Sequence, residues 1–241
     1  MQTFSAVLWD MDGTLVDTEH YWMEAIAALM GEHGLTWSQE QQLLMVGNDL
    51  IDSAKILVAH GLPLDPPVIV EDLLDRVGVL VAEHVPFRPG VQALLAELRA
   101  QQIPCMLVTM SYRRLAEAVV AACPEGTFTG IIAGDDVSRG KPDPEPYLTA
   151  AAALDLAPGK CLALEDSVPG ITSAVAAGTL AIGIPHHVPL ADGPGRVLVP
   201  TLDGMTVETL GSLARSLTGP HAALLTESPS SHLPEASRRS G

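Results

Sequence analysis

From Pro89-Gly90 onward, short apolar runs alternate with stretches in which apolar residues recur every three or four positions. The apolar runs cover 103–110, 130–134, 161–166 and 179–185, and the helical stretches cover 89–99, 113–123, 144–154 and 170–178. Alternation of this kind is typical of β-α-β units, in which a parallel sheet is covered by helices. We therefore expect an α/β fold with a Rossmann-like parallel sheet.

The first apolar run, SAVLWD at 5–10, predicts a further buried strand that is separated from the others. Between them, residues 17–86 show helical periods and no convincing strand, which indicates a helical cap inserted after the first strand. We therefore expect a core of residues 1–16 plus 87–217 and a cap of residues 17–86. Residues 218–241 are rich in Ser, Pro and Gly, and we expect a disordered tail there.

Charge and composition limit the kinds of molecule that this protein can bind. The net charge of −16 disfavours nucleic acid and anionic membranes as main partners. No apolar run reaches the roughly 18–20 residues that a membrane span needs, and the start lacks the features of a signal peptide. Three cysteines without CxxC spacing are typical of buried thiols in a reducing compartment. We expect a cytoplasmic monomer that acts on a small molecule.

Polar side chains follow the predicted strands at the points where they end. The candidate site residues are Asp10, Asp12, Thr109, Met110, Ser111, Lys141, Glu165 and Asp166. Because the carboxyl ends of parallel strands meet at one edge of a sheet, where ligands bind, we expect these residues to lie together.

Each candidate also has a purely structural interpretation. Asp166 or Ser167 can cap the following helix, as Thr109 and Ser111 can, and Lys141 taken alone is typical of a solvated turn. A calcium loop starting at Asp10 is excluded, because its twelfth position holds a tyrosine where a glutamate is needed. Neither GxxxxGK[ST] nor GxGxxG occurs, so a P-loop or dinucleotide site lacks support.

Four segments in this order resemble the motifs of the haloacid dehalogenase-like phosphohydrolases. They are DMDGTLVD (10–17), VTMS (108–111), GKPDPEPY (140–147) and LEDSVPG (164–170). The resemblance runs from about residue 5 to 187, and the inserted helices resemble the small cap of the β-phosphoglucomutase-like and 2-deoxyglucose-6-phosphatase-like members. It implies a phosphatase that hydrolyses a small phosphorylated metabolite, a sugar phosphate, through an aspartyl phosphate.

The resemblance also implies roles for the candidate residues. Asp10 is the expected nucleophile, Asp12 the acid and base, and Lys141 the cation beside both nucleophile and phosphate. Mg²⁺ is the expected cofactor, held by Asp10, Asp12 (through its backbone carbonyl), Glu165 and Asp166. Thr109, Met110, Ser111 and Lys141 are expected to bind the phosphoryl oxygens.

Two other functions stay open. A sugar-phosphate mutase would carry an arginine where the stretch after Gly47 has Leu50, and 17–86 offers only Lys55 and Arg76 as fixed cations. A non-catalytic module that binds phosphate and Mg²⁺ would have no use for the acid–base residue Asp12.

Three further positions are ambiguous in the sequence. Trp22 can contact substrate or fill the cap core, and His20 is expected on a helix surface. His186-His187 is expected on the surface of a loop rather than at a metal, because adjacent histidines do not share a helix face.

Overall fold

The computed structural model describes residues 3–42, 45 and 50–218. Its centre is a six-stranded sheet in the order β3-β2-β1-β4-β5-β6, in which all neighbouring strands run parallel. The strands are β1 (Ala6–Trp9), β2 (Cys105–Val108), β3 (Gly130–Ile132), β4 (Cys161–Glu165), β5 (Leu180–Gly183) and β6 (Arg196–Leu198). The order reverses at β1, so β2 and β4 flank it and bring their carboxyl ends to the same place.

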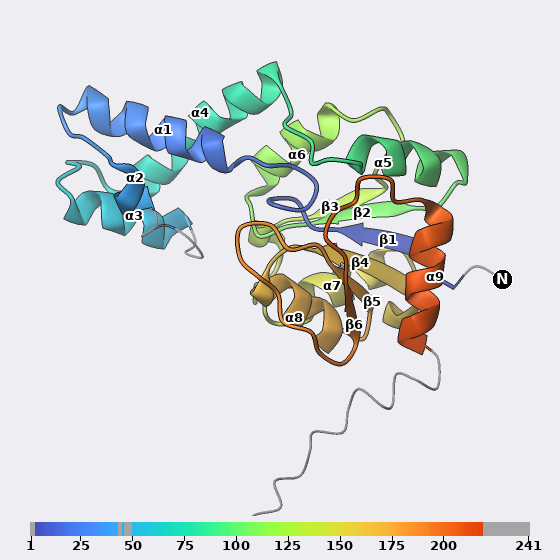
Figure 1. Cartoon of the computed structure of the whole chain (residues 1–241). Coiled ribbons are helices and arrows are strands. Elements are labelled where there is room, and N and C mark those ends of the chain that lie inside the picture. Colours follow the sequence, from blue (N-terminus) through green and yellow to red (C-terminus); the bar gives the residue numbers. More distant parts are fainter. Residues whose placement is uncertain (1–2, 43–44, 46–49, 219–241) are drawn as a thin grey trace, which may run out of the picture.

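Helices cover both faces of the sheet (Figure 1). They are α5 (Val91–Ala100), α6 (Arg113–Ala121), α7 (Glu145–Ala153), α8 (Val168–Ala176) and α9 (Val207–Thr218). Alternation along the strands explains the two layers, because Val7 and Trp9 of β1 pack with α5, α6 and α9, whereas Ala6 and Leu8 pack with α7 and α8. The central strands β1 and β2 contain only buried apolar residues, as expected of a sheet that is covered on both faces.

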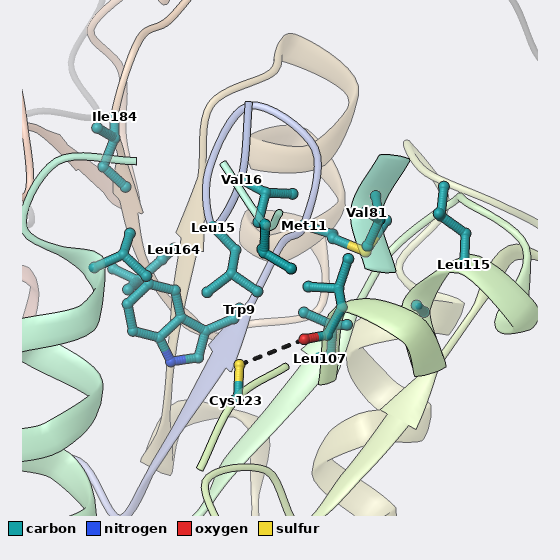
Figure 2. Packing of buried hydrophobic residues seen from close by; sticks show 14 of the residues in the cluster. Trp9, Met11, Leu15, Val16, Val81, Leu107, Leu115, Cys123, Leu164 and Ile184 are labelled. Atoms are coloured by element: carbon teal, nitrogen blue, oxygen red, sulfur yellow. Dashed lines mark hydrogen bonds between the residues drawn. The ribbon is translucent and has the colours of Figure 1, made fainter. Parts of the chain in front are cut away.

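The inserted helices form a separate group beside the sheet (Figure 1). They are α1 (Glu19–Glu32), α2 (Gln39–Gln42), α3 (Leu50–Ala59) and α4 (Pro66–Glu83). Their apolar faces bury Leu29, Leu57 and Leu73 against one another. The packing is continuous with the sheet through Met11, Leu15, Val16 and Val81, as Figure 2 shows.

Two linkers join these helices to the core, the first at residues 15–18 and the second at residues 85–88, and they run side by side. Asp17 N–H donates to Pro86 O at 2.9 Å, and Arg88 N–H donates to Leu15 O at 3.0 Å. On α6, Arg114 forms ion pairs with Glu71 and Asp75 of α4, at 3.5 and 2.9 Å. These contacts hold the inserted helices against one end of the core.

The predicted α/β fold with an inserted helical cap is confirmed, and the three cysteines are buried free thiols as expected. The residue limits of cap and core stay predictions. Neither β6 nor α9 was among the predicted elements, and Thr218 ends α9 instead of beginning the tail. Residues 219–241, and with them the expected disorder, lie outside the described residues. No helix in the described part of the chain has the length and apolar character needed to cross a membrane.

Candidate active site

The predicted site residues come together at the carboxyl ends of three neighbouring strands. Asp10 follows β1 directly, Thr109 follows β2, and Glu165 is the last residue of β4. The register of β1 with β4 places Trp9 opposite Leu164, so Asp10 and Glu165 emerge at the same level. Backbone geometry alone therefore brings two carboxylates to one point of the sheet edge.

Lys141 lies between these two carboxylates. Its ammonium donates to Asp10 Oδ1 at 2.6 Å, to Glu165 Oε1 at 2.7 Å and to the backbone carbonyl of Val108 at 2.8 Å. The three contacts match the three protons that an ammonium can donate. Burial alone would lower the pKa of Lys141, but the carboxylates of Asp10 and Glu165 raise it above its ordinary value, so the side chain is a cation.

Glu165 is fully buried and fully bonded. Besides Lys141, it accepts from the hydroxyl of Tyr147 at 2.6 Å and from that of Ser167 at 3.2 Å. The start of α8 lies so close to it that a Cβ on Gly170 would come within 1.9 Å of Glu165 Oε2. Burial, followed by the charge of Asp10, raises the pKa of Glu165.

Asp12 is held by two hydroxyl groups from different parts of the chain. Thr18 Oγ1 donates to Asp12 Oδ1 and Ser111 Oγ donates to Asp12 Oδ2, both at 2.6 Å. Thr18 precedes α1, so the first linker of the inserted helices takes part in orienting this carboxyl. Burial raises the pKa of Asp12 despite the two donors, which favours the protonated form that a general acid requires.

Asp166 completes a cluster of acids. One carboxylate oxygen each from Asp10, Glu165 and Asp166 lies within 4.8 Å of the others. Burial, followed by the charges of Asp10 and Glu165, raises the pKa of Asp166 to about 8. At Gly13, where φ is +86°, a Cβ would meet Asp166 Oδ2 at 2.1 Å, so the chain leaves room for this carboxylate.

These residues fit a hard divalent cation. The donors are carboxylate oxygens, which Mg²⁺ prefers, and the cluster carries more negative charge than Lys141 balances. Burial and the neighbouring carboxylates of Asp10 and Glu165 raise the pKa of Asp166, and a cation among the three carboxylates would lower it again. These three carboxylates, which the sequence predicted as metal ligands, could therefore hold a metal ion.

The predicted phosphate-binding segment lies beside Asp10. Thr109 is buried, and its hydroxyl accepts from the backbone N–H of Ser111 at 3.0 Å, which shapes the turn after β2. Met110 accepts from the N–H of Lys141 through its sulfur at 3.2 Å and so supports the lysine loop. The hydroxyl of Ser111 is directed at Asp12, a partner that the sequence did not suggest.

The helix-capping alternative holds for one of its four candidates. Ser167 caps α8 by accepting from Gly170 N–H at 3.1 Å. Asp166 lies in the acid cluster instead, and α6 begins without a side-chain cap from Thr109 or Ser111. Tyr147 and Thr18 are the site residues that the sequence analysis missed. Each lies within or next to a motif, but neither spacing nor residue type shows that its hydroxyl faces a carboxylate.

The two adjacent histidines lie in the loop after β5, beside the first linker. The prediction of a loop surface holds for His187, which is half-exposed, and is wrong for His186, whose side chain is only 16% exposed. Ligand atoms of His186, His187 and Asp17 lie within 4.8 Å of one another. However, Arg88 donates to His186 Nδ1, so the neutral ring carries its proton on Nε2 and offers no lone pair to a metal there. Burial, followed by the charge of Arg88, lowers the pKa of His186 and favours this neutral ring.

The inserted helices show where the remaining candidates lie. His20 is exposed as expected, and Trp22 packs partly against the buried core. Lys55 pairs with Asp52 at 2.7 Å, and Arg76 binds Glu32 and Asp72. Both cap cations therefore have carboxylate partners within the cap. Gly47 lies outside the described residues.

Comparison with known proteins agrees with the geometry. The family model described as haloacid dehalogenase-like hydrolase matches residues 4–178. The chain belongs to this family. This match confirms the resemblance found in the motifs and the prediction that the protein is a hydrolase of this family.

Similar proteins carry several activities. A bifunctional riboflavin kinase/FMN phosphatase from Arabidopsis thaliana is 31% identical over 75% of this chain, which spans about half of that protein (48%). A validoxylamine A 7'-phosphate phosphatase from Streptomyces hygroscopicus subsp. limoneus is 32% identical over 75% of this chain and 85% of its own length. A β-phosphoglucomutase from Bacillus subtilis is 28% identical, with coverages of 85% and 93%.

A solved structure shows the same architecture. CbbY from Rhodobacter sphaeroides in complex with phosphate superposes with a TM-score of 0.75, covers 86% of this chain and 99% of its own, and is 29% identical. The sheet and its inserted helices thus recur together in a relative.

Proposed function

We propose that this protein is a Mg²⁺-dependent phosphatase that hydrolyses a small phosphorylated metabolite, a sugar phosphate, through an aspartyl phosphate. The observation that carries the proposal is the ammonium of Lys141 bound to Asp10, with Asp12 held by hydroxyl groups nearby. A phosphate dianion repels a bare carboxylate, and this arrangement gives the nucleophile a fixed cation. Phosphatases among the relatives support the reaction class.

The first step is attack of an Asp10 carboxylate oxygen on phosphorus. The bond between phosphorus and the ester oxygen breaks, and protonated Asp12 gives its proton to the departing alcohol. Thr18 and Ser111 fix the direction of that proton because they hold both oxygens of Asp12. Lys141 offsets the negative charge that collects around Asp10.

In the second step, water attacks the phosphorus of the aspartyl phosphate. Asp12, now a carboxylate, takes a proton from this water, and the bond between phosphorus and Asp10 breaks to release inorganic phosphate. Asp10, Glu165, Asp166 and the backbone carbonyl of Asp12 would hold the metal. Mg²⁺ bound there would supply Lewis-acid polarisation of the phosphoryl oxygens and would neutralise their charge.

A mutase remains the second candidate, because a β-phosphoglucomutase is among the relatives. Such an enzyme must hold a second phosphate in the cap. Lys55 and Arg76, the cations that the cap sequence offers, are paired with cap carboxylates, and this favours hydrolysis. A module that only binds phosphate is disfavoured by the orientation of Asp12, since binding needs no acid–base group. We further propose a cytoplasmic monomer, with residues 17–86 as the cap.

The test is phosphate release from a panel of sugar phosphates with Mg²⁺ or with EDTA. The wild type should be active only with Mg²⁺, and Asp10→Asn should lose activity by at least about a thousandfold, because an amide cannot act as this nucleophile. Asp155→Asn is the matched control: Asp155 is exposed and has a φ of +55°, which asparagine adopts readily. Turnover by Asp10→Asn close to that of the control would refute the proposal.

The same preparation distinguishes hydrolysis from isomerisation. We expect phosphorus NMR of a reaction with β-glucose 1-phosphate to show inorganic phosphate. Formation of glucose 6-phosphate faster than phosphate release would instead identify a mutase.

A further inference from the structure

Tyr147 is a fully buried side chain on the face of the sheet that α7 and α8 cover. Its hydroxyl reaches the acid cluster of Asp10, Glu165 and Asp166. Tyr147 belongs to α7 and packs in the layer that contains Leu8, Met106 and Val108. Its hydroxyl donates to Glu165 Oε1 at 2.6 Å, and the centroid of its ring lies 5.2 Å from Lys141 Nζ. One side chain thus donates to the carboxylate of Glu165 and places its ring under the ammonium beside Asp10.

Glu165 Oε1 is a shared acceptor. Lys141 Nζ donates to it at 2.7 Å while the hydroxyl of Tyr147 donates at 2.6 Å. The other acceptors of Lys141 are the backbone carbonyl of Val108, which belongs to strand β2, and Asp10 itself. Glu165 has rotatable side-chain bonds, so its position depends on the groups that hold it, and Tyr147 is a rigid ring fixed by core packing.

The ring of Tyr147 acts on Lys141 as well. A cation within about 6 Å of an aromatic centroid is attracted to the ring when it lies over its face. The tyrosine therefore constrains the ammonium directly through its ring and indirectly through the shared oxygen. A phenylalanine at this position would keep the first constraint and lose the second.

Loss of the hydroxyl has a definite geometric consequence. Glu165 Oε1 would keep Lys141 as its donor and could turn toward it, which draws Nζ away from Asp10. The nucleophile would then lose part of its countercharge, although no residue that touches the substrate has been replaced. Only Lys141 and Ser167, at 2.7 and 3.2 Å, would then hold the carboxylate of Glu165, so its place beside Asp10 and Asp166 in the acid cluster would be less firmly fixed.

We propose that Tyr147 is a positioning residue of this site: its hydroxyl fixes Glu165 so that Lys141 is held on Asp10 and the acid cluster keeps its shape. The inference rests on the proposed phosphatase function. It adds a residue outside the acids and the lysine, and it gives the buried phenol a role beyond filling the core.

The test compares Tyr147→Phe with Tyr21→Phe. Tyr21 is a buried tyrosine of the cap whose hydroxyl donates to His84 O at 2.9 Å, so both variants remove one bonded phenol hydroxyl. We expect kcat of Tyr147→Phe to fall by about tenfold or more, as is usual when a residue that hydrogen-bonds a metal ligand is lost. KM for the substrate should stay within about twofold of the wild-type value. An increase in KM at unchanged kcat would instead indicate a uniform loss of substrate binding. Tyr21→Phe should keep its kcat even if its melting temperature falls.

Calorimetric titration with Mg²⁺ alone provides a readout that does not depend on turnover. Tyr147→Phe should bind Mg²⁺ about tenfold more weakly than the wild type, and Tyr21→Phe should bind it equally well. A kcat for Tyr147→Phe within twofold of the wild type would overturn the inference, as would equal losses of kcat in both variants. If the wild type releases no phosphate from the panel, the proposed function fails. The positioning role of Tyr147 is then judged by Mg²⁺ affinity alone, and an unchanged affinity in Tyr147→Phe would overturn it.

Discussion

Replacing Lys141 by methionine would remove the ammonium between Asp10 and Glu165 while keeping a side chain of similar length. The side chains of Lys141, Asp10 and Glu165 are 4%, 11% and 0% exposed, so water cannot replace the lost charge. Removing one partner of a buried ion pair typically costs about 3–5 kcal/mol, and we expect a loss of this size in the free energy of unfolding near pH 8. That is a large share of the roughly 5–15 kcal/mol of a typical domain.

The size of this loss should depend on pH. Without the lysine, Glu165 is a buried anion that faces the charge of Asp10, so Glu165 binds a proton more readily in the folded than in the unfolded protein. Protonation at low pH therefore relieves the repulsion, and the loss should shrink between pH 8 and pH 5.5. Lys141 itself stays charged over this range because its pKa is raised.

Urea denaturation in EDTA, followed by circular dichroism at both pH values, measures the loss. Lys160→Met is the control, because Lys160 is exposed, and its effect should stay within about 0.5 kcal/mol. A loss below about 1 kcal/mol for Lys141→Met at pH 8, or an equal loss at both pH values, would refute this account of the buried charges.

Two other predictions concern the acid cluster. Gly13→Ala should weaken Mg²⁺ binding by at least about tenfold, since the new Cβ meets Asp166. Gly178→Ala is the control, because Gly178 has a φ of +79° and nothing within 4 Å of the added Cβ, so only backbone strain is expected. Equal effects of the two variants on Mg²⁺ affinity would contradict the argument. Because the pKa of Asp166 is raised to about 8 and Mg²⁺ must displace that proton, affinity should rise by up to about tenfold per pH unit from pH 6 to 7 and level off above pH 8. Calorimetry across this range checks it, and an affinity independent of pH would count against a protonated cluster.

The sequence predicted the edge of the site better than its interior. Asp10 and Glu165 could be placed together because each lies at the carboxyl end of a predicted strand, and the carboxyl ends of parallel strands meet at one edge of the sheet. The bonds from Tyr147 to Glu165 and from Thr18 to Asp12 depend on how α7 and the first linker pack, which local patterns do not encode. The same limit explains His186, whose burial results from contact with a linker almost a hundred residues away in sequence.

Missed elements have a different cause. Strand β6 contains three half-buried residues, too few for a period to be recognised. Helix α9 buries Val207, Leu210 and Ala214 at helical spacing, so its pattern was present in the sequence but was not assigned.

The paired linkers have an evolutionary consequence. The backbone of Asp17 and that of Pro86 are one hydrogen bond apart, so the inserted helices leave and rejoin the core at almost the same point. For the sheet, such an insertion is equivalent to a surface loop, and insertions whose ends lie close together are well tolerated. The core can therefore keep its strand order and its acids while the inserted segment is exchanged, lengthened or recombined between relatives.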